Sequence, residues 1–245
     1  YIGNKTSIVH EIDNFLVNCG LSGNEYIFFD AFCGTGSVAE YFKSRYSIII
    51  NDIMKWAVIY TQGKIVAPTC TFKKLGFDPF DFFNGNHNVR HDFIYNNYAP
   101  TNTSRMYFTP ENAERIDYFR WQIEKWKESK LISSEEYCFL LACLIESVSS
   151  VSNTAGVYGA FLKKWDSRAL KEIHFSKVDF SEQPYKFLCA YNNKIEDIIE
   201  NVDCDILYLD PPYTQNQYGT QYHLLETLVL NDNPNICLLY TSDAA

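Results

Sequence analysis

The stretch Glu25–Phe42, which reads "EYIFFDAFCGTGSVAEYF", decides the fold. It begins with an apolar run typical of a buried strand, passes through Gly34 and Gly36, and continues with residues that favour a helix. Glycines between a strand and a helix let the backbone turn tightly and approach a ligand closely. The stretch therefore predicts a strand, a ligand-binding turn and a helix of an α/β sheet.

Two further apolar runs end in acids. "YSIIIND" ends at Asp52, and "DILYLDPPY" reaches Asp210 immediately before two prolines. Proline cannot donate a hydrogen bond to a sheet, so the second run must stop as a strand at Asp210. Continuous apolar strands that alternate with helices indicate a parallel sheet covered on both faces, and ligands bind such a sheet at the carboxyl ends of its strands.

Residues 66–181 break this alternation. Thr109 followed by Pro110 predicts the start of one helix, and Ser133-x-x-Glu136 predicts the capping box of a second. A loop-rich aromatic segment precedes these helices, and a polar loop follows them. We therefore expect an inserted, mainly helical subdomain.

The 245 residues carry a net charge of −9, and 47% of them are hydrophobic. Such a chain can bury a large core, and no apolar run is long enough to span a membrane, so we expect no membrane partner. The negative total does not favour nucleic acid, but a local basic face suffices, and "LKKW" with Arg168 and Lys171 forms one. The eight cysteines contain no C-x-x-C pair, so we expect no metal site.

The glycine turn predicts a cofactor that contains adenosine. Gly34-x-Gly36-x-x-Ala39 fits the dinucleotide fingerprint, and Asp52 lies where an acid can bond ribose hydroxyls. The turn alone does not distinguish NAD from S-adenosylmethionine. Asp30 favours S-adenosylmethionine, because an acid there can pair with the ammonium group of that cofactor and would repel a pyrophosphate. A NAD-dependent oxidoreductase stays the remote alternative.

Four motifs then occur in a characteristic order: "YIGNK", "DAFCGTG", "IIINDI" and "LDPPY". Together they resemble the DNA adenine methylases in which the cofactor motifs precede the catalytic motif and the target-recognition region lies between them. The resemblance implies an α/β fold with a Rossmann-like methyltransferase sheet. It also implies three segments, which are the N-terminal part of the cofactor-binding domain (1–65), the inserted target-recognition region (66–181) and the catalytic part (182–236). On separate grounds, given below, we expect residues 237–245 to be a non-native tail.

By the same resemblance, nine residues would hold S-adenosylmethionine. Those near its carboxylate end are Lys5 with Tyr1 and Gly3, those along its methionine part are Asp30, Phe32, Gly34 and Gly36, and the ribose contact is Asp52. Asn193 stands where the family often carries an acid near the adenine of the cofactor. An asparagine can still bond an adenine amino group through its carbonyl oxygen.

The motif Asp210-Pro211-Pro212-Tyr213 would be catalytic. The exocyclic amine of adenine is a poor nucleophile until its lone pair is localised. The carboxylate of Asp210 and the carbonyl of Pro211 can accept its hydrogens, and these bonds strengthen as positive charge grows on nitrogen. Pro212 helps to keep the acceptors rigid, and Tyr213 offers a face on which the extruded base stacks.

The resemblance implies N6-adenine methylation of double-stranded DNA by a cytoplasmic enzyme of a prokaryote or phage, and it leaves room for a cognate restriction endonuclease as a partner. Two alternatives stay open. The chain could methylate N4 of cytosine or an RNA base, since these enzymes share an acid-Pro-Pro-aromatic turn. It could also be a non-catalytic DNA-binding relic, since the acid near the cofactor adenine is replaced.

The last nine residues, "CLLYTSDAA", resemble an in-frame translation of a sequencing-library adapter, and an ordinary irregular tail is the alternative. We therefore expect a C-terminally truncated chain. In the family's sheet, the strand before Asp210 is central. Its residues Ile206 and Leu207 are both apolar and point to opposite faces, so each face of the strand should be packed against other parts of the protein. Left at an edge, such a strand promotes aggregation, so we expect low stability and weak activity.

Overall fold

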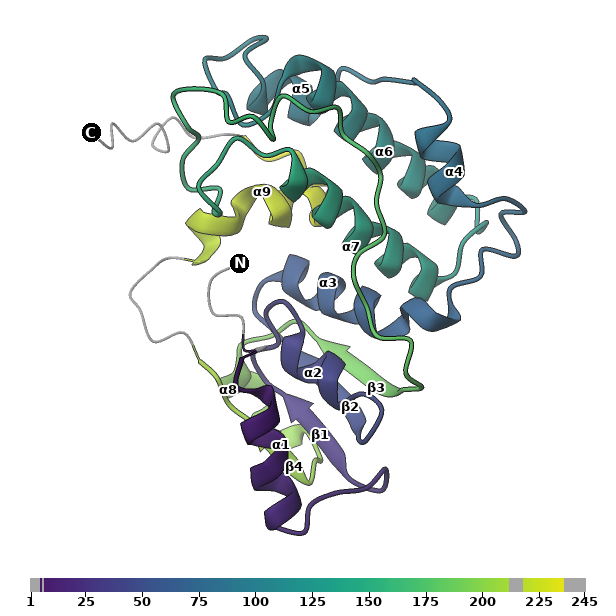
Figure 1. Cartoon of the computed structure of the whole chain (residues 1–245), viewed down its shortest axis with the longest axis vertical. Coiled ribbons are helices and arrows are strands. Elements are labelled where there is room, and N and C mark those ends of the chain that lie inside the picture. Colours follow the sequence, from purple (N-terminus) through teal and green to yellow (C-terminus); the bar gives the residue numbers. More distant parts are fainter. Residues whose placement is uncertain (1–4, 6, 212–217, 236–245) are drawn as a thin grey trace. The chain divides into compact units, whose positions relative to one another are not determined.

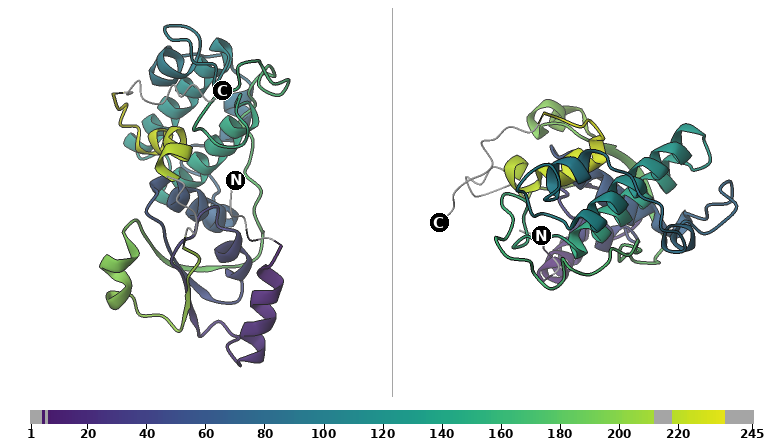
Figure 2. Two further views of the ribbon diagram at one scale, coloured as in Figure 1. Left: turned by 90° about the vertical axis from the view of Figure 1, so that its left-hand side faces the viewer. Right: turned by 90° about the horizontal axis from the view of Figure 1, so that it is seen from above.

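The computed structural model describes residues 5, 7–211 and 218–235. They form two compact units (Figures 1 and 2). The sheet unit consists of the described residues within 1–71 and 179–216, and the helical unit consists of those within 72–178 and 217–245. The sheet unit is therefore built from two segments that are far apart in the sequence.

The sheet unit contains a four-stranded sheet with the order β3-β2-β1-β4. The strands are β1 (Ile27–Asp30), β2 (Ser47–Asn51), β3 (Lys186–Tyr191) and β4 (Ile206–Tyr208). The helices of this unit are α1 (Val9–Asn18), α2 (Ser37–Phe42), α3 (Lys55–Val66), η1 (Ala67–Thr69), α8 (Ile195–Ile198) and η2 (Ile199–Asn201). Every strand pair is parallel, which confirms the predicted sheet.

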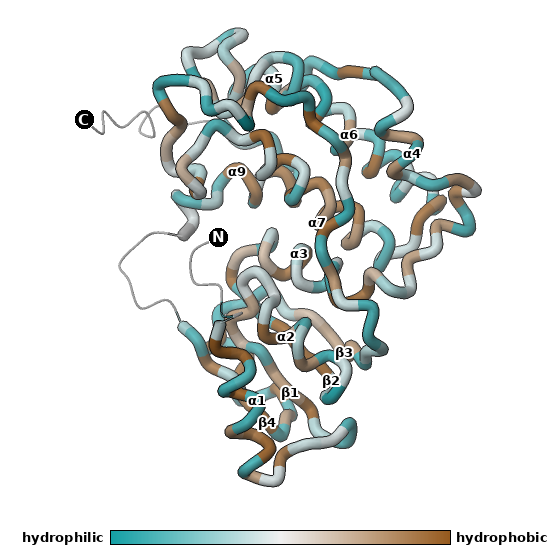
Figure 3. The backbone as a smooth tube through the Cα atoms, in the orientation of Figure 1, coloured by the Kyte–Doolittle hydropathy of each residue, from teal (hydrophilic) through white to brown (hydrophobic). Residues whose placement is uncertain are grey.

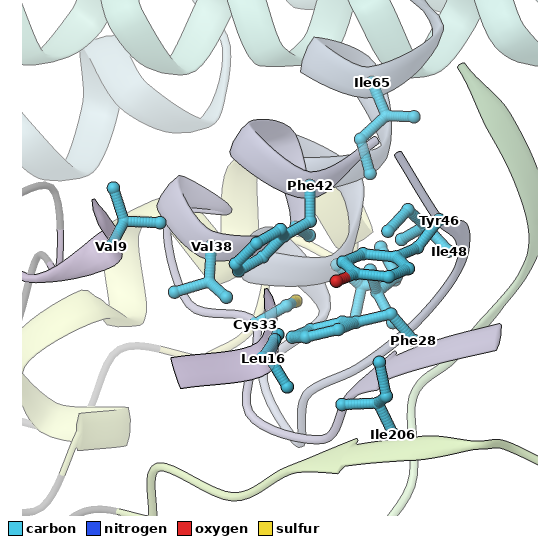
Figure 4. Packing of buried hydrophobic residues seen from close by; sticks show 13 residues of the cluster. Val9, Leu16, Phe28, Cys33, Val38, Phe42, Tyr46, Ile48, Ile65 and Ile206 are labelled. Carbon is cyan, nitrogen blue, oxygen red and sulfur yellow. The ribbon is translucent and has the colours of Figure 1, made fainter. Parts of the chain in front are cut away.

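The two faces of the sheet carry unequal cores. On one face, residues of α1, α2 and α3 pack against the strands, and the rings of Phe28, Phe42 and Tyr46 meet at its centre (Figure 4). Ring centroids lie 5.0 Å apart for Phe28 and Phe42 and 5.7 Å apart for Phe28 and Tyr46. On the other face, Phe29 and Ile49 belong to a smaller cluster that includes residues of α8. Figure 2 shows α1 and α8 on opposite sides of the strands.

Within the sheet unit, α2 fastens the chain where it returns toward β3. The backbone N–H of Ser181 donates to Oε1 of Glu40 at 2.7 Å, and the Ser181 carbonyl accepts from Nζ of Lys43 at 2.7 Å. Lys43 is only 1% exposed, so its ammonium depends on such acceptors. These contacts position β3 beside β2.

The helical unit contains α4 (Pro79–Asn84), α5 (Phe93–Tyr98), α6 (Pro110–Glu128), α7 (Ser134–Ser150) and α9 (Tyr218–Leu230). Hydrophobic residues dominate α7 (Figure 3). The Thr109 side chain accepts the backbone N–H of Asn112, and Ser133 and Glu136 form the reciprocal capping box. Both predicted helix starts are therefore confirmed.

An aromatic cluster forms the core of the helical unit. The ring of Phe83 lies 5.0 Å from Phe119, 5.0 Å from Trp126 and 4.5 Å from Phe175, measured between centroids. The irregular segment after α7 is held by the buried amide of Asn153, which donates to the carbonyls of Met106 and Leu162. In this way the Asn153 side chain supplies hydrogen bonds to backbone carbonyls that have no partner in a regular helix or sheet.

Helix α9 belongs to the helical unit, and the expected assignment of 182–236 to the catalytic part stays a prediction. Within the helical unit α9 packs against α7, and its residues Leu224, Leu225 and Leu228 are buried. Nε of Arg120 donates to the carbonyl of Leu228 at 2.6 Å, and this satisfies a carbonyl at the end of α9. A buried apolar face and a held helix end explain why residues 218–230 belong to the helical unit.

Among the described strands, β4 pairs only with β1. Ile206 is 8% exposed and packs in the larger core, whereas Leu207 on the opposite face is 40% exposed. The expectation that β4 is a central strand stays a prediction, and the segment 237–245 lies outside the described residues.

Candidate active site

The carboxyl ends of the four parallel strands meet at one edge of the sheet, where α/β proteins bind ligands. Asp30 ends β1, Asp52 follows β2, Asn193 follows β3 and Asp210 follows β4. A pocket at this edge combines five of the predicted site residues with five others. The described residues that line it are Lys5, Asp30, Phe32, Cys33, Gly34, Thr35, Ser37, Val38, Tyr208 and Asp210.

The turn after β1 requires glycine at two positions. Gly34 has φ +50° and Gly36 has φ +76°, a region that other residues rarely adopt. A Cβ on Gly36 would lie 2.7 Å from Oγ1 of Thr61, whose hydroxyl donates to the Gly34 carbonyl at 3.1 Å. A Cβ on Gly34 would meet nothing within 4 Å. The turn is thus packed against α3 on one side and open to a ligand on the other.

Asp30 is the most distinctive group in the pocket. It is 1% exposed, and its Oδ1 has no hydrogen-bond partner among the described residues. Burial raises the pKa of Asp30 to about 7; a backbone hydrogen bond from Phe32 lowers it, and the neighbouring Asp52 and Asp210 raise it further. A buried carboxylate oxygen without a partner is unfavourable unless a donor or a cation binds to it. This site therefore fits an ammonium group.

Asp52 braces the glycine turn. Its Oδ2 accepts the backbone N–H of Gly34 at 3.0 Å, and its Oδ1 accepts that of Met54 at 2.9 Å. The structure does not bring Asp52 into the lining of the pocket, although a carboxylate retains acceptor capacity beyond these two bonds.

Two asparagines tie together the loops at this edge: Asn51, which sequence reasoning missed, and Asn192, which stands with Asn193 where the family often carries an acid. The buried amide of Asn51 donates to the carbonyls of Ala31 and Asn193 at 3.0 and 3.1 Å. The amide of Asn192 donates to the carbonyls of Asp52 and Ile53 at 2.9 and 3.0 Å. The side chain of Asn193 itself is exposed. An asparagine at the end of an apolar strand was the available signal for Asn51.

Asp210 lies in the same pocket and pairs with Lys5. Nζ of Lys5 is 3.1 Å from Oδ1 of Asp210, and the two side chains are 19% and 20% exposed. Pro211 is exposed. The other predicted site residues lie outside the described part of the chain, and they are Tyr1, Gly3, Pro212 and Tyr213.

Five residues of the pocket were not predicted, among them Cys33 and Tyr208. Burial raises the pKa of the Cys33 thiol, so this cysteine is not an activated nucleophile. Tyr208 is the last residue of β4 and precedes Asp210 by two positions, and period-two alternation along the extended chain is the signal that could have placed it.

Five basic residues of the helical unit fall into two groups, arginines that donate to carbonyls of the chain itself and exposed lysines. Arg168 donates to the carbonyl of Thr154, and Arg105 is 9% exposed and donates to the carbonyl of Asn97 at 3.3 Å. The three lysines of this region are exposed, and they are Lys163, Lys164 and Lys171. The lysines are therefore better placed than the arginines to meet an external anion.

None of the helices in the described residues is long and apolar enough to cross a membrane. In the same residues, no group of three or more histidine, cysteine, aspartate or glutamate side chains is arranged to hold a metal ion.

A parallel sheet with a glycine turn after its first strand and acids at its carboxyl edge defines the chain as a Rossmann-like methyltransferase fold. The sequence model of the family described as D12 class N6 adenine-specific DNA methyltransferases matches residues 1–241 of the chain. The chain belongs to this family.

Curated relatives are methylases of restriction–modification type. The chain is 38% identical to the modification methylase LlaI of Lactococcus lactis subsp. lactis, and the match covers 96% of the chain and 39% of the relative. It is also 38% identical to the type II methyltransferase M.FokI of Planomicrobium okeanokoites, over 96% of the chain and 37% of the relative. The type II methyltransferase M.NlaIII of Neisseria lactamica is 35% identical, over 95% of the chain and 70% of the relative. The chain thus spans less than two fifths of the length of each of the first two relatives.

Proposed function

We propose that the chain transfers a methyl group from S-adenosylmethionine to the exocyclic N6 of an adenine in double-stranded DNA. The observation that carries this proposal is the shared pocket, in which Asp30, with a carboxylate oxygen suited to an ammonium group, lies beside Asp210 of the motif expected to bind the adenine. Membership of the D12 class supports the reaction type.

The residues of the pocket would hold the cofactor through complementary charges. Asp30 binds the ammonium group of its methionine part, and Lys5, with Tyr1 and Gly3, contacts the carboxylate. The open side of the glycine turn supports this arrangement. The remaining proposed contacts are Phe32, Gly34 and Gly36 along the methionine part, Asp52 at the ribose and Asn193 at the adenine ring.

The catalytic step needs acceptors for the adenine amine. When bound, S-adenosylmethionine supplies an electrophilic methyl group on a sulfonium. Asp210 and the carbonyl of Pro211 accept the hydrogens of the amine, which localises the nitrogen lone pair and stabilises the positive charge that develops there. Pro212 limits the motion of these acceptors, and Tyr213 stacks on the extruded base, a contact worth about 1–3 kcal/mol.

The helical unit would recognise the target. Its exposed lysines, Lys163, Lys164 and Lys171, are suited to phosphate contacts, which position a protein on DNA. The names of the relatives as type II enzymes support a cognate endonuclease as a partner and a bacterial or phage cytoplasm as the setting.

Mass identification of the nucleosides tests the reaction. The protein is incubated with unmethylated DNA and S-adenosylmethionine, and the digested DNA is analysed. We expect N6-methyladenine with the wild type and with Asp203→Ala, an exposed acid near β4, and none with Asp210→Ala. N4-methylcytosine would keep the mechanism and replace the substrate. Cofactor binding without any methylated base would overturn the proposal in favour of a DNA-binding relic.

A further inference from the structure

The ion pair between Lys5 and Asp210 joins a residue expected at the cofactor to the residue expected at the adenine. Nζ of Lys5 lies 3.1 Å from Oδ1 of Asp210. Both side chains are about four-fifths buried, at 19% and 20% exposure, so the pair is only partly screened by water. Neither of the roles proposed above requires this contact.

The backbone of Lys5 is anchored. Its carbonyl accepts the N–H groups of Ile8 and Val9 at 3.0 and 3.1 Å, which fixes it to the first turn of α1. Val9 is buried in the larger core, and the carboxylate of Asp13 on α1 pairs with Arg45 after α2. The Lys5 side chain therefore reaches the pocket from a fixed helix start.

The charges around the pocket favour a cation at this position. The carboxylates of Asp30 on β1 and Asp210 after β4 line the pocket, together with Cys33 and Tyr208. The carboxylate of Asp52 after β2 lies outside this lining but close enough to raise the pKa of Asp30. Among the described residues that line it, Lys5 is the basic one. Its ammonium offsets the repulsion between the acids.

We infer that Lys5 is a positioning residue for Asp210, whose Oδ1 it holds so that Oδ2 faces the adenine amine. This inference rests on the proposed function. An ammonium group has three donors, so Lys5 can hold Asp210 and still contact the carboxylate of the cofactor. Fixing the acceptor before the amine arrives lowers the reorganisation needed in the transition state, which increases the rate of methyl transfer.

Steady-state kinetics separate this role from simple cofactor binding. At saturating S-adenosylmethionine and DNA, we expect Lys5→Gln to lower kcat on the order of tenfold to a hundredfold, as for the loss of a charge-assisted hydrogen bond. Lys5→Arg keeps a donor and a charge, so it should retain more of kcat than Lys5→Gln. The matched control is Lys186→Gln. Lys186 is exposed and begins β3, at the end of the strand away from the pocket, so this change should leave kcat unchanged.

Two other results are informative. A rise in KM for S-adenosylmethionine with unchanged kcat in Lys5→Gln would overturn the inference, because Lys5 would then serve only the cofactor. A wild type that forms no N6-methyladenine would refute the proposed function, and the inference with it. Equal melting temperatures of the variants and the wild type, measured without cofactor, confirm that a loss of kcat does not come from unfolding.

Discussion

Asp30 in the sheet unit and Asp117 in the helical unit are both buried carboxylates, but they differ in their partners. Asp117 accepts the backbone N–H groups of Asp92, Ile94 and Tyr95, each at 2.9 Å, at the start of α5. Oδ1 of Asp30 has no such partner in the described parts of the chain. Burial raises the pKa of both, to about 6 for Asp117 and to about 7 for Asp30.

The contrast separates a carboxylate that stabilises the fold from one kept for a ligand. Burial of either charge costs free energy. At Asp117 three hydrogen bonds offset that cost within the folded chain. At Asp30 the backbone hydrogen bond from Phe32 offsets part of that cost, and a cation that binds to Oδ1 would offset more of it.

The largest expected effect is on stability. Asp117→Ala leaves three backbone N–H groups without their acceptor, and we expect the free energy of unfolding to fall by about 3 kcal/mol, measured by chemical denaturation. Glu111→Ala, an exposed change on the same helix, should alter it by less than about 0.5 kcal/mol. The affinity for S-adenosylmethionine should not change. Unchanged stability in Asp117→Ala would remove the contrast between the two acids.

The next effect is on cofactor affinity. Asp30→Asn removes the charge expected to pair with the ammonium group, so calorimetry should show the dissociation constant of S-adenosylmethionine rising on the order of a hundredfold. Without cofactor at pH 8, the variant should be no less stable than the wild type, because an unfavourable buried charge is gone. Asp203→Asn serves as the exposed control. A strongly destabilised Asp30→Asn would mean that Asp30 is structural, as Asp117 is.

A smaller effect concerns the pH dependence of binding. Asp30 must be ionised to pair with the ammonium group, and its pKa in the free protein is about 7. The dissociation constant should therefore be flat well above this pH and should rise about tenfold between pH 8 and pH 6. This dependence should be absent in Asp30→Asn. A flat profile for the wild type would show that the carboxylate is already ionised without cofactor.

The smallest effect concerns the pH dependence of stability. The carboxyl of Asp30 has an ordinary pKa of 3.8 and a folded pKa of about 7, so the folded state binds the proton more tightly in this interval. The resulting destabilisation of the folded state is absent below pH 3.8, grows as the pH rises and is complete above about pH 7. Relative to Asp30→Asn, the cofactor-free wild type should lose about 0.7 kcal/mol from pH 6.5 to pH 7.5. A constant difference between them would contradict the shifted pKa.

Local signals in the sequence predicted much of the fold. The glycine turn, the apolar strands and the helix starts at Thr109 and Ser133 each depend on neighbours within a few residues, and the structure has all of them. The parallel arrangement followed because continuous apolar strands alternate with helices. The position of Asp30 and Asp210 at one edge followed from the parallel arrangement.

Features that depend on distant segments could not be predicted in this way. The placement of α9 depends on Arg120, which is 108 positions from Leu228. The loops at the carboxyl edge are joined by Asn51 and Asn193, which are 142 positions apart. No spacing rule in one sequence reveals such pairs, and the same holds for the contact between Lys5 and Asp210.

The hydrogen bond between Glu40 and Ser181 joins positions 141 residues apart, and this has a consequence for the order of folding. During synthesis, β2 leaves the ribosome long before β3 exists to pair with it. The helices α4 to α7 follow one another directly and can pack as soon as they emerge, whereas parallel pairing across a long loop is slow. We expect α4 to α7 to be folded while the edge of β2 is still unpaired. The sheet whose strand ends carry the acids of the pocket is then completed only after these helices.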